Sequence, residues 1–198
     1  MEKVINIFKK QFGYAYLRDL KKQGVHTDTV RNLVQQGKIE KIKPGLYKLV
    51  DMPMLANQGM IDVYMSMPKA VVCLHSALSY YDLTTTIPDR VMVALPRQEK
   101  PSKIQYPPVQ IFYYSEKNYQ IGIKEVKTES GIFKIYEPEK TIVDCFRYRN
   151  KMGLDAATEG LKNYLKGKQK DLVKLIEFAK TGRMYKIMKP YIEAIIEQ

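Results

Sequence analysis

The sequence predicts an α+β protein with two domains, residues 1–50 and residues 51–198. The first fifty residues hold three short amphipathic segments followed by two strand-like segments around a Pro-Gly pair. The remainder holds several segments rich in β-branched and aromatic residues, which predict an antiparallel sheet. Amphipathic helical patterns then fill the chain from Leu154 onward. This order predicts a larger second domain with a helical C-terminal end.

Glycines divide the first three predicted helices. Apolar residues from Val4 to Phe12 recur on one helical face, and Gly13 ends this helix. A second helix is predicted over residues 14–23, with Gly24 at its C-terminal end.

Thr27 is predicted to cap the third helix, because its hydroxyl can accept from an unpaired backbone amide of the first turn. Gly37 suits the left-handed position after the last turn. The predicted buried face of this helix holds three apolar residues: Val30, Leu33 and Val34.

A β-hairpin follows, with strands predicted over 38–43 and 46–50 and a turn at Pro44-Gly45. Three helices and then a hairpin, all within fifty residues, are typical of a winged helix-turn-helix.

The stretch "DMPMLANQG" from Asp51 is predicted to connect the two domains. In the second domain Pro138 suits the first turn of a helix. The other elements expected there are a helix over 58–67, a short strand and a helix ending near residue 82, strands over 89–96, 109–115, 121–128 and 131–137, and helices over 154–166, 170–181 and 184–197.

Charge is the most informative feature of the composition. The chain carries a formal net charge of +12, of which residues 1–50 contribute +7. A positive field of this size favours a polyanion, either nucleic acid or an anionic membrane surface. No run of about 18 apolar residues exists, so no transmembrane helix is expected. Cys73 and Cys145 are too few for a disulfide framework and fit a reduced, cytoplasmic protein.

Known catalytic motifs are missing from the sequence, which predicts that the protein is not an enzyme and uses no cofactor or metal. Two alternatives stay open: His75 beside Ser76 could form part of a nucleophilic site, and Asp144 in "TIVDCF" could be an active-site acid. A structural role explains each better: a histidine at a helix start beside an apolar run, and a satisfied internal carboxylate. Glu137 and Glu139 are expected to stabilise a helix start through the macrodipole.

The third predicted helix has the residue types that read DNA bases. Arginine pairs with guanine, and asparagine or glutamine pairs with adenine, in the major groove. Basic residues of the preceding helix and of the hairpin would meet phosphates. The predicted DNA-binding residues are Arg18, Lys21, Lys22, Thr27, Asp28, Thr29, Arg31, Asn32, Gln35, Lys38, Lys41 and Lys43.

A second basic concentration lies between Arg147 and Lys189, with 12 basic and 4 acidic residues. It is either a solvated helix surface or a further surface for phosphate or a partner. Its candidate residues are Lys162, Lys166, Lys170, Lys174, Arg183, Lys186 and Lys189.

The stretch "GYAYLRDLKKQGVHTDTVRNLVQQGKIEKIKPGLYKL" resembles the winged helix of AbiEi-type antitoxins from abortive-infection systems. The later "LHSALSYYDL", "VMVALP" and "IYEPEKTIVDCFRYR" resemble the second domain of that family. Lys43-Pro44 departs from the family pattern, in which an arginine often precedes the glycine of the wing.

The resemblance implies an antitoxin of a type IV toxin–antitoxin system in phage defence. Such a protein represses its own operon by binding inverted repeats in promoter DNA, and it counteracts a nucleotidyltransferase toxin with or without direct contact. Two hypotheses of other classes remain: a nucleic-acid-processing enzyme that uses the winged helix for targeting, and an interaction module whose winged helix binds protein.

Overall fold

The computed structural model describes residues 2–51 and 57–197. The chain divides into two compact units. Unit 1 comprises residues 1–68, 100–108 and 126–133, and unit 2 comprises residues 69–99, 109–125 and 134–198. Unit 1 thus contains more than the first fifty residues, and a separately folding domain over 1–50 remains a prediction. Part of the expected connection, residues 52–56, lies outside the described residues.

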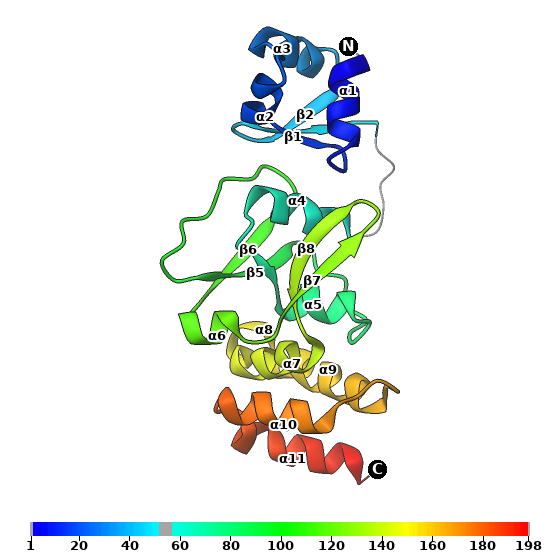
Figure 1. The fold of residues 1–198 in the computed structure, drawn as a ribbon. Helices are drawn as coiled ribbons and strands as arrows, with labels where there is room; N and C mark the ends of the chain where they lie inside the picture. Colours follow the sequence, from blue (N-terminus) through cyan, green and yellow to red (C-terminus); the bar gives the residue numbers. More distant parts are fainter. Residues whose placement is uncertain (1, 52–56, 198) are drawn as a thin grey trace. The chain divides into compact units, whose positions relative to one another are not determined.

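The N-terminal part is a winged helix-turn-helix, as the order of elements predicts (Figure 1). Its strands form an antiparallel sheet in the order β1-β3-β2. Gly45 turns between β2 and β3 with a positive φ of 80°. The elements are α1 (Glu2–Lys9), β1 (Tyr14–Tyr16), α2 (Leu17–Lys22), α3 (Thr27–Gln35), β2 (Ile39–Lys43) and β3 (Leu46–Leu49).

Two local predictions in this part are wrong. Residues 14–16 form strand β1 rather than the start of a helix, because Tyr14 and Tyr16 pair with Lys48 and Leu46 of β3. Thr27 is the first residue of α3, and the N-cap position belongs to His26, whose side chain makes no capping hydrogen bond. The predicted positive φ of Gly37 after α3 is confirmed at 67°.

Apolar side chains from α1, α2, α3 and one face of the sheet form the core of this part. Phe8 and Leu20 are fully buried, and Val30 and Leu33 bring the inner face of α3 to them. Val34 was expected to share this face but is 37% exposed, so it lies at the edge of the core.

A five-stranded sheet follows, in the order β6-β5-β4-β8-β7. It is mixed rather than wholly antiparallel: β4 runs antiparallel to β5, whereas the pairs β4–β8 and β5–β6 are parallel. The strands are β4 (Val71–Val72), β5 (Val91–Pro96), β6 (Val109–Tyr114), β7 (Ile123–Thr128) and β8 (Gly131–Tyr136).

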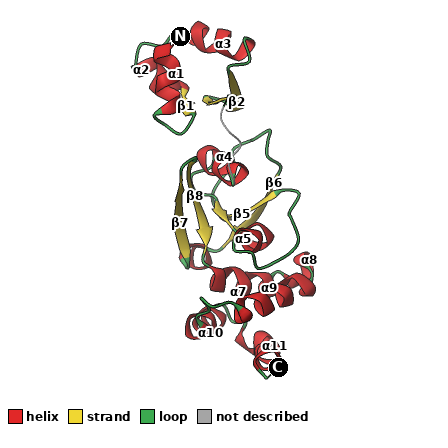
Figure 2. Ribbon diagram, turned by 90° about the vertical axis from the view of Figure 1, so that its right-hand side faces the viewer, coloured by secondary structure: helices red, strands yellow, loops and turns green. Residues whose placement is uncertain are grey.

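Helices gather at one end of this sheet in both views, with α7, α9, α10 and α11 in succession (Figure 2). Leu78, Phe146 and Leu161 lie in the apolar core of unit 2, which the partly buried Tyr148 packs against. Helices α6 and α8 were not predicted, because each is too short to show a period. The helices are α4 (Gln58–Ser66), α5 (Leu74–Tyr80), α6 (Glu116–Gln120), α7 (Pro138–Arg147), α8 (Arg149–Met152), α9 (Leu154–Lys166), α10 (Leu172–Thr181) and α11 (Tyr185–Ile196).

Candidate nucleic-acid interface

Helix α3 presents a polar face to solvent. Val30 and Leu33 are 1% and 2% exposed, and they fix which side of the helix faces the core. Thr29 is half-buried at the border of the two faces. The exposed polar side chains of α3 are all among the predicted DNA-binding residues: Thr27, Asp28, Arg31, Asn32 and Gln35.

Arg31 is held only loosely. Its Nη1 lies 3.1 Å from Asp28 Oδ1, one turn earlier in α3, and the two side chains are 67% and 82% exposed. An ion pair of this kind contributes at most about 1 kcal/mol in water. The guanidinium can therefore exchange Asp28 for a base or a phosphate at little cost.

Helix α2 contributes the next group of predicted contacts. Arg18 lies 5.0 Å from the ring centre of Tyr16, and its Nε is 3.7 Å from Asp19 Oδ1. Lys21 and Lys22 are exposed at the end of α2. These three cations belong to the same compact unit as α3 and fit the expected role in phosphate binding.

The hairpin lysines divide into two kinds. Lys41 is exposed and Lys38 is half-buried. Lys43 instead donates to the carbonyl of Ser66, and its Nζ lies 3.5 Å from Ser102 Oγ. Burial lowers the pKa of Lys43. Its place among the phosphate contacts stays a prediction, and in this structure its ammonium group has protein acceptors.

Helix α4 carries the residues that the sequence reasoning missed. Asp62 is 4% exposed and accepts from the Tyr14 hydroxyl and from Lys48, whose Nζ lies 3.0 Å from Oδ1. Burial is the main cause that raises the pKa of Tyr14, and the Asp62 carboxylate adds to it. Asp62 interrupts the otherwise apolar segment "MIDVYM", and a buried carboxylate of this kind signals a partner elsewhere.

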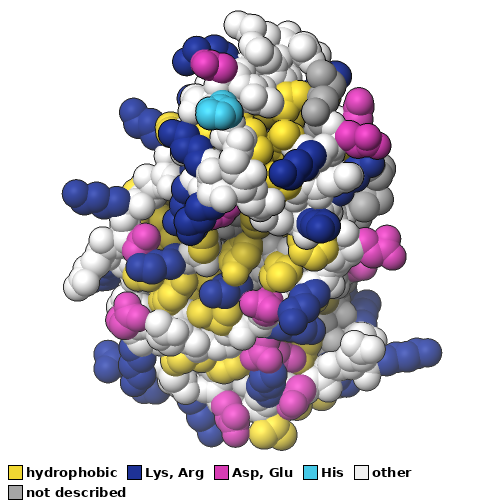
Figure 3. All heavy atoms as spheres, turned by 45° about the horizontal axis from the view of Figure 1, so that its top comes forward, with side chains coloured by type: hydrophobic (Ala, Val, Ile, Leu, Met, Phe, Trp, Pro, Cys, Tyr) yellow, Lys and Arg dark blue, Asp and Glu magenta, His cyan; other side chains and the backbone are white. Residues whose placement is uncertain are grey.

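The C-terminal basic residues differ in their surroundings. Lys174 forms an ion pair with Glu137 Oε1 at 2.7 Å, and Lys189 lies 3.5 Å from Glu193 Oε1. Lys170 donates to the carbonyl of Leu165 at 2.7 Å. The other four predicted residues are exposed: Lys162, Lys166, Arg183 and Lys186. On the face shown in Figure 3, lysine and arginine side chains are spread widely, with acidic side chains between them.

Two of the residues suspected of catalysis, Ser76 and Asp144, make contacts that explain them structurally. Ser76 Oγ accepts from the Met92 amide at 2.9 Å and lies 3.3 Å from the carbonyl oxygen of Arg90, so it joins α5 to β5. Asp144 is 1% exposed and forms a buried ion pair with Lys140, one turn earlier in α7. Burial raises the pKa of Asp144 and lowers the pKa of Lys140, and each partner opposes the other's shift.

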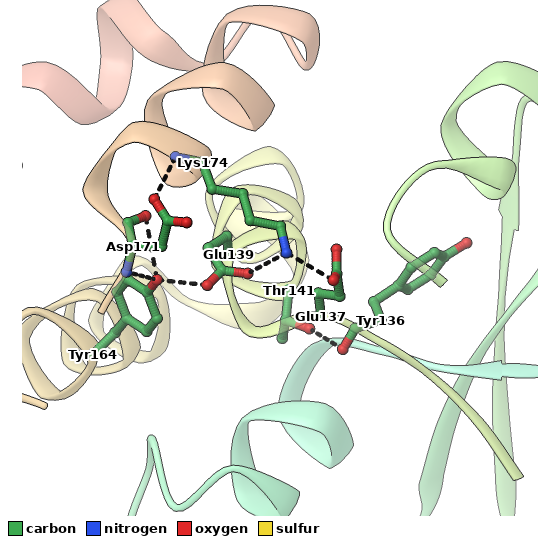
Figure 4. A network of polar contacts seen from close by, with 7 residues as sticks. All are labelled: Tyr136, Glu137, Glu139, Thr141, Tyr164, Asp171 and Lys174. Atoms are coloured by element: carbon green, nitrogen blue, oxygen red, sulfur yellow. Dashed lines mark hydrogen bonds and ion pairs between the residues drawn. The ribbon is translucent and has the colours of Figure 1, made fainter. Parts of the chain in front are cut away.

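The glutamates at the start of α7 tie three helices together (Figure 4). The Tyr164 hydroxyl of α9 donates to Glu139 Oε1 at 2.6 Å and accepts from the Asp171 amide at 2.6 Å. Lys174 of α10 pairs with Glu137, and Asp171 caps α10 by accepting from the Lys174 amide at 2.9 Å. This network cross-links α7, α9 and α10. Among the described residues no group of His, Cys, Asp and Glu side chains is arranged to hold a metal ion.

The region that contains the exposed face of α3 matches a known protein family. Residues 2–50 match the family described as "Transcriptional regulator, AbiEi antitoxin". The N-terminal region is similar to AbiEi antitoxins. This confirms the resemblance noted for the N-terminal stretch and supports a regulator or antitoxin role for that region, whereas the second-domain segments lie outside the matched residues. The matched range contains the whole winged helix, including every predicted DNA-binding residue.

Curated proteins offer no match to the chain. Within the described residues, no helix has both the length and the apolar character needed to span a bilayer.

Proposed function

We propose that the protein is an antitoxin and transcriptional autorepressor of a toxin–antitoxin operon in phage defence. It binds inverted repeats in its own promoter through the AbiEi-like winged helix. One observation carries this proposal: the polar side chains of α3 are exposed within the region that matches a family of transcriptional regulators.

Affinity and specificity come from different residues of unit 1. Arg18, Lys21, Lys22 and Lys41 supply positive charge for phosphate, a sequence-independent contribution that weakens as salt rises. Thr29, Arg31, Asn32 and Gln35 read base edges, and Thr27 and Asp28 flank them at the helix start.

The antitoxin activity is assigned to the larger C-terminal part, following the family resemblance. Its functional partner is a nucleotidyltransferase toxin. The exposed cations Lys162, Lys166, Arg183 and Lys186 give this part a surface for a polyanion or an acidic partner. Co-expression tests this role: the chain should restore growth of cells that carry the toxin gene adjacent to its own.

DNA binding is tested with a shift assay on the region upstream of the protein's own gene, against random DNA of equal length. Retention of the upstream fragment is expected at about 50–100 mM salt, where phosphate contacts are still strong. Loss of retention in this range would favour an interaction module. Metal-dependent turnover of labelled DNA, RNA or nucleotides would favour a nucleic-acid-processing enzyme.

A further inference from the structure

The three-stranded sheet of the winged helix has two differently occupied faces. Ala15, Ile39 and Leu49 point to the core formed with α1, α2 and α3. Tyr14 and Lys48 are directly opposite each other in β1 and β3, so their side chains share the other face. This second face carries polar groups, and they contact α4, which belongs to the same compact unit.

Asp62 is the centre of this contact. Its carboxylate accepts from the Tyr14 hydroxyl and lies 3.0 and 3.2 Å from Lys48 Nζ. Gln58, one turn earlier in α4, donates to Tyr14 Oη at 2.7 Å. A single carboxylate therefore joins both outer-face partners of the β1–β3 pair.

The C-terminal end of α4 makes a second contact with the same sheet. Tyr16 Oη donates to the carbonyl of Met65 at 2.7 Å, and Lys43 donates to the carbonyl of Ser66. Carbonyls of the last helical turn have no partner within the helix and carry its negative dipole end. A hydroxyl and an ammonium group from the sheet satisfy two of them.

We infer that Asp62 is a positioning residue of the DNA interface and that the hairpin lysines have separate roles. Lys43 and Lys48 hold the wing on α4, whereas Lys41 meets phosphate. This inference rests on the proposed DNA binding and deepens it. Held by α4, the hairpin keeps one orientation relative to α3, so base reading and phosphate contact occur together. The sequence alone had placed Lys43 among the phosphate contacts, and the two assignments predict different salt dependence.

Salt titration of binding to the upstream fragment separates the two roles. A lysine that contacts phosphate adds about 0.9 to the slope of log affinity against log salt. Lys41→Met should therefore flatten the slope by about 0.9. Lys43→Met should lower affinity by a similar factor at every salt concentration and leave the slope unchanged. A slope reduced by Lys43→Met, or a titration curve identical to the parent's, would overturn the inference.

Lys48 is tested together with Asp62, because removing one member of a buried ion pair leaves an uncompensated charge. The double variant Lys48→Met/Asp62→Asn removes both charges and keeps an acceptor for Tyr14. It should shift the titration curve in parallel, as Lys43→Met does, and a flatter slope would assign Lys48 to phosphate. If this variant does not fold, Tyr16→Phe deletes one uncharged anchoring contact and should give the same parallel shift.

The attachment of the wing to α4 through Asp62, here called the anchor, can also be tested without DNA. Tyr14→Phe and Asp62→Asn remove two members of one network, so their combined shift in Tm should be smaller than the sum of the single shifts. Additive shifts would show that the two groups do not act together and would overturn the anchor. If the parent protein binds no DNA but the Tm shifts are non-additive, the proposed function fails while the anchor stands.

Discussion

Helices α3 and α7 use similar charged residues in opposite ways. In α3, Arg31 and Asp28 form an ion pair with side chains 67% and 82% exposed. In α7, Lys140 and Asp144 form an ion pair with side chains 5% and 1% exposed. Both pairs join neighbouring turns of a helix, with a spacing of three residues in α3 and four in α7, and their exposure differs sharply.

Exposure decides what each pair can do. Water competes for the α3 pair, so its members exchange partners freely and are available to DNA. The α7 pair is shielded from water, so loss of Asp144 would leave the ammonium group of Lys140 buried without its carboxylate. The comparison teaches that a charged motif in this chain is a binding candidate only where solvent reaches it.

The largest effect is expected in α7. Asp144→Ala should lower the free energy of unfolding by about 3–5 kcal/mol, because Lys140 is left buried without its carboxylate. Urea denaturation followed by circular dichroism measures this loss. The double variant Lys140→Met/Asp144→Leu is the control and should lie closer to the parent. A single variant as stable as the parent would show that burial does not distinguish the two helices.

Arg31 should show the opposite behaviour, with function lost and stability kept. Arg31→Ala is expected to reduce discrimination between the upstream fragment and random DNA by about 1–3 kcal/mol. Arg90 is a matched control, because it forms a similarly exposed pair with Asp89 in unit 2. Competition binding of both variants measures the effect. Equal discrimination by parent and Arg31→Ala would remove Arg31 from the base-reading residues.

Lys41 should affect all DNA alike. Lys41→Ala is expected to weaken binding to upstream and random DNA equally and to flatten the salt slope by about 0.9. The exposed Lys117 of α6 gives a control substitution outside the winged helix. A change confined to the upstream fragment would mean that Lys41 reads sequence rather than phosphate.

The smallest effect concerns pH. Burial lowers the pKa of His75 below its usual value, with Glu159 opposing the shift. Between about pH 7.5 and about pH 5.5 the native state therefore binds fewer protons at His75 than the unfolded state does. As a result, the contribution of His75 to the free energy of unfolding falls as the pH drops through this interval. His75→Gln should have a Tm that depends less on pH over this interval. An unchanged dependence would assign the effect to other groups.

Sequence features that act over a few residues predicted much of the secondary structure. The helix over residues 154–166 and the helix start at Pro138 were predicted at the residues where they occur. Strand β1 was not, because Tyr14–Tyr16 becomes a strand only by pairing with β3, thirty residues later in the chain. Hydrophobic periodicity carries no information about such a partner.

The candidate site shows the same limit. Apolar spacing identified the exposed face of α3, since Val30 and Leu33 define the buried side. It did not separate Lys41 from Lys43, because the acceptor of Lys43 is a backbone carbonyl of α4.

The sequence by itself determined the winged helix, its basic character and the polar residues on the outer face of α3. These follow from helical periodicity, turn-forming glycines and net charge, which act between residues close in the chain. Only the tertiary structure decided which lysines are held by Asp62 and Ser66 and which charges of α7 are buried. The physical reason is that solvent access and ion pairing depend on segments that meet in space, and residues far apart in the sequence supply them.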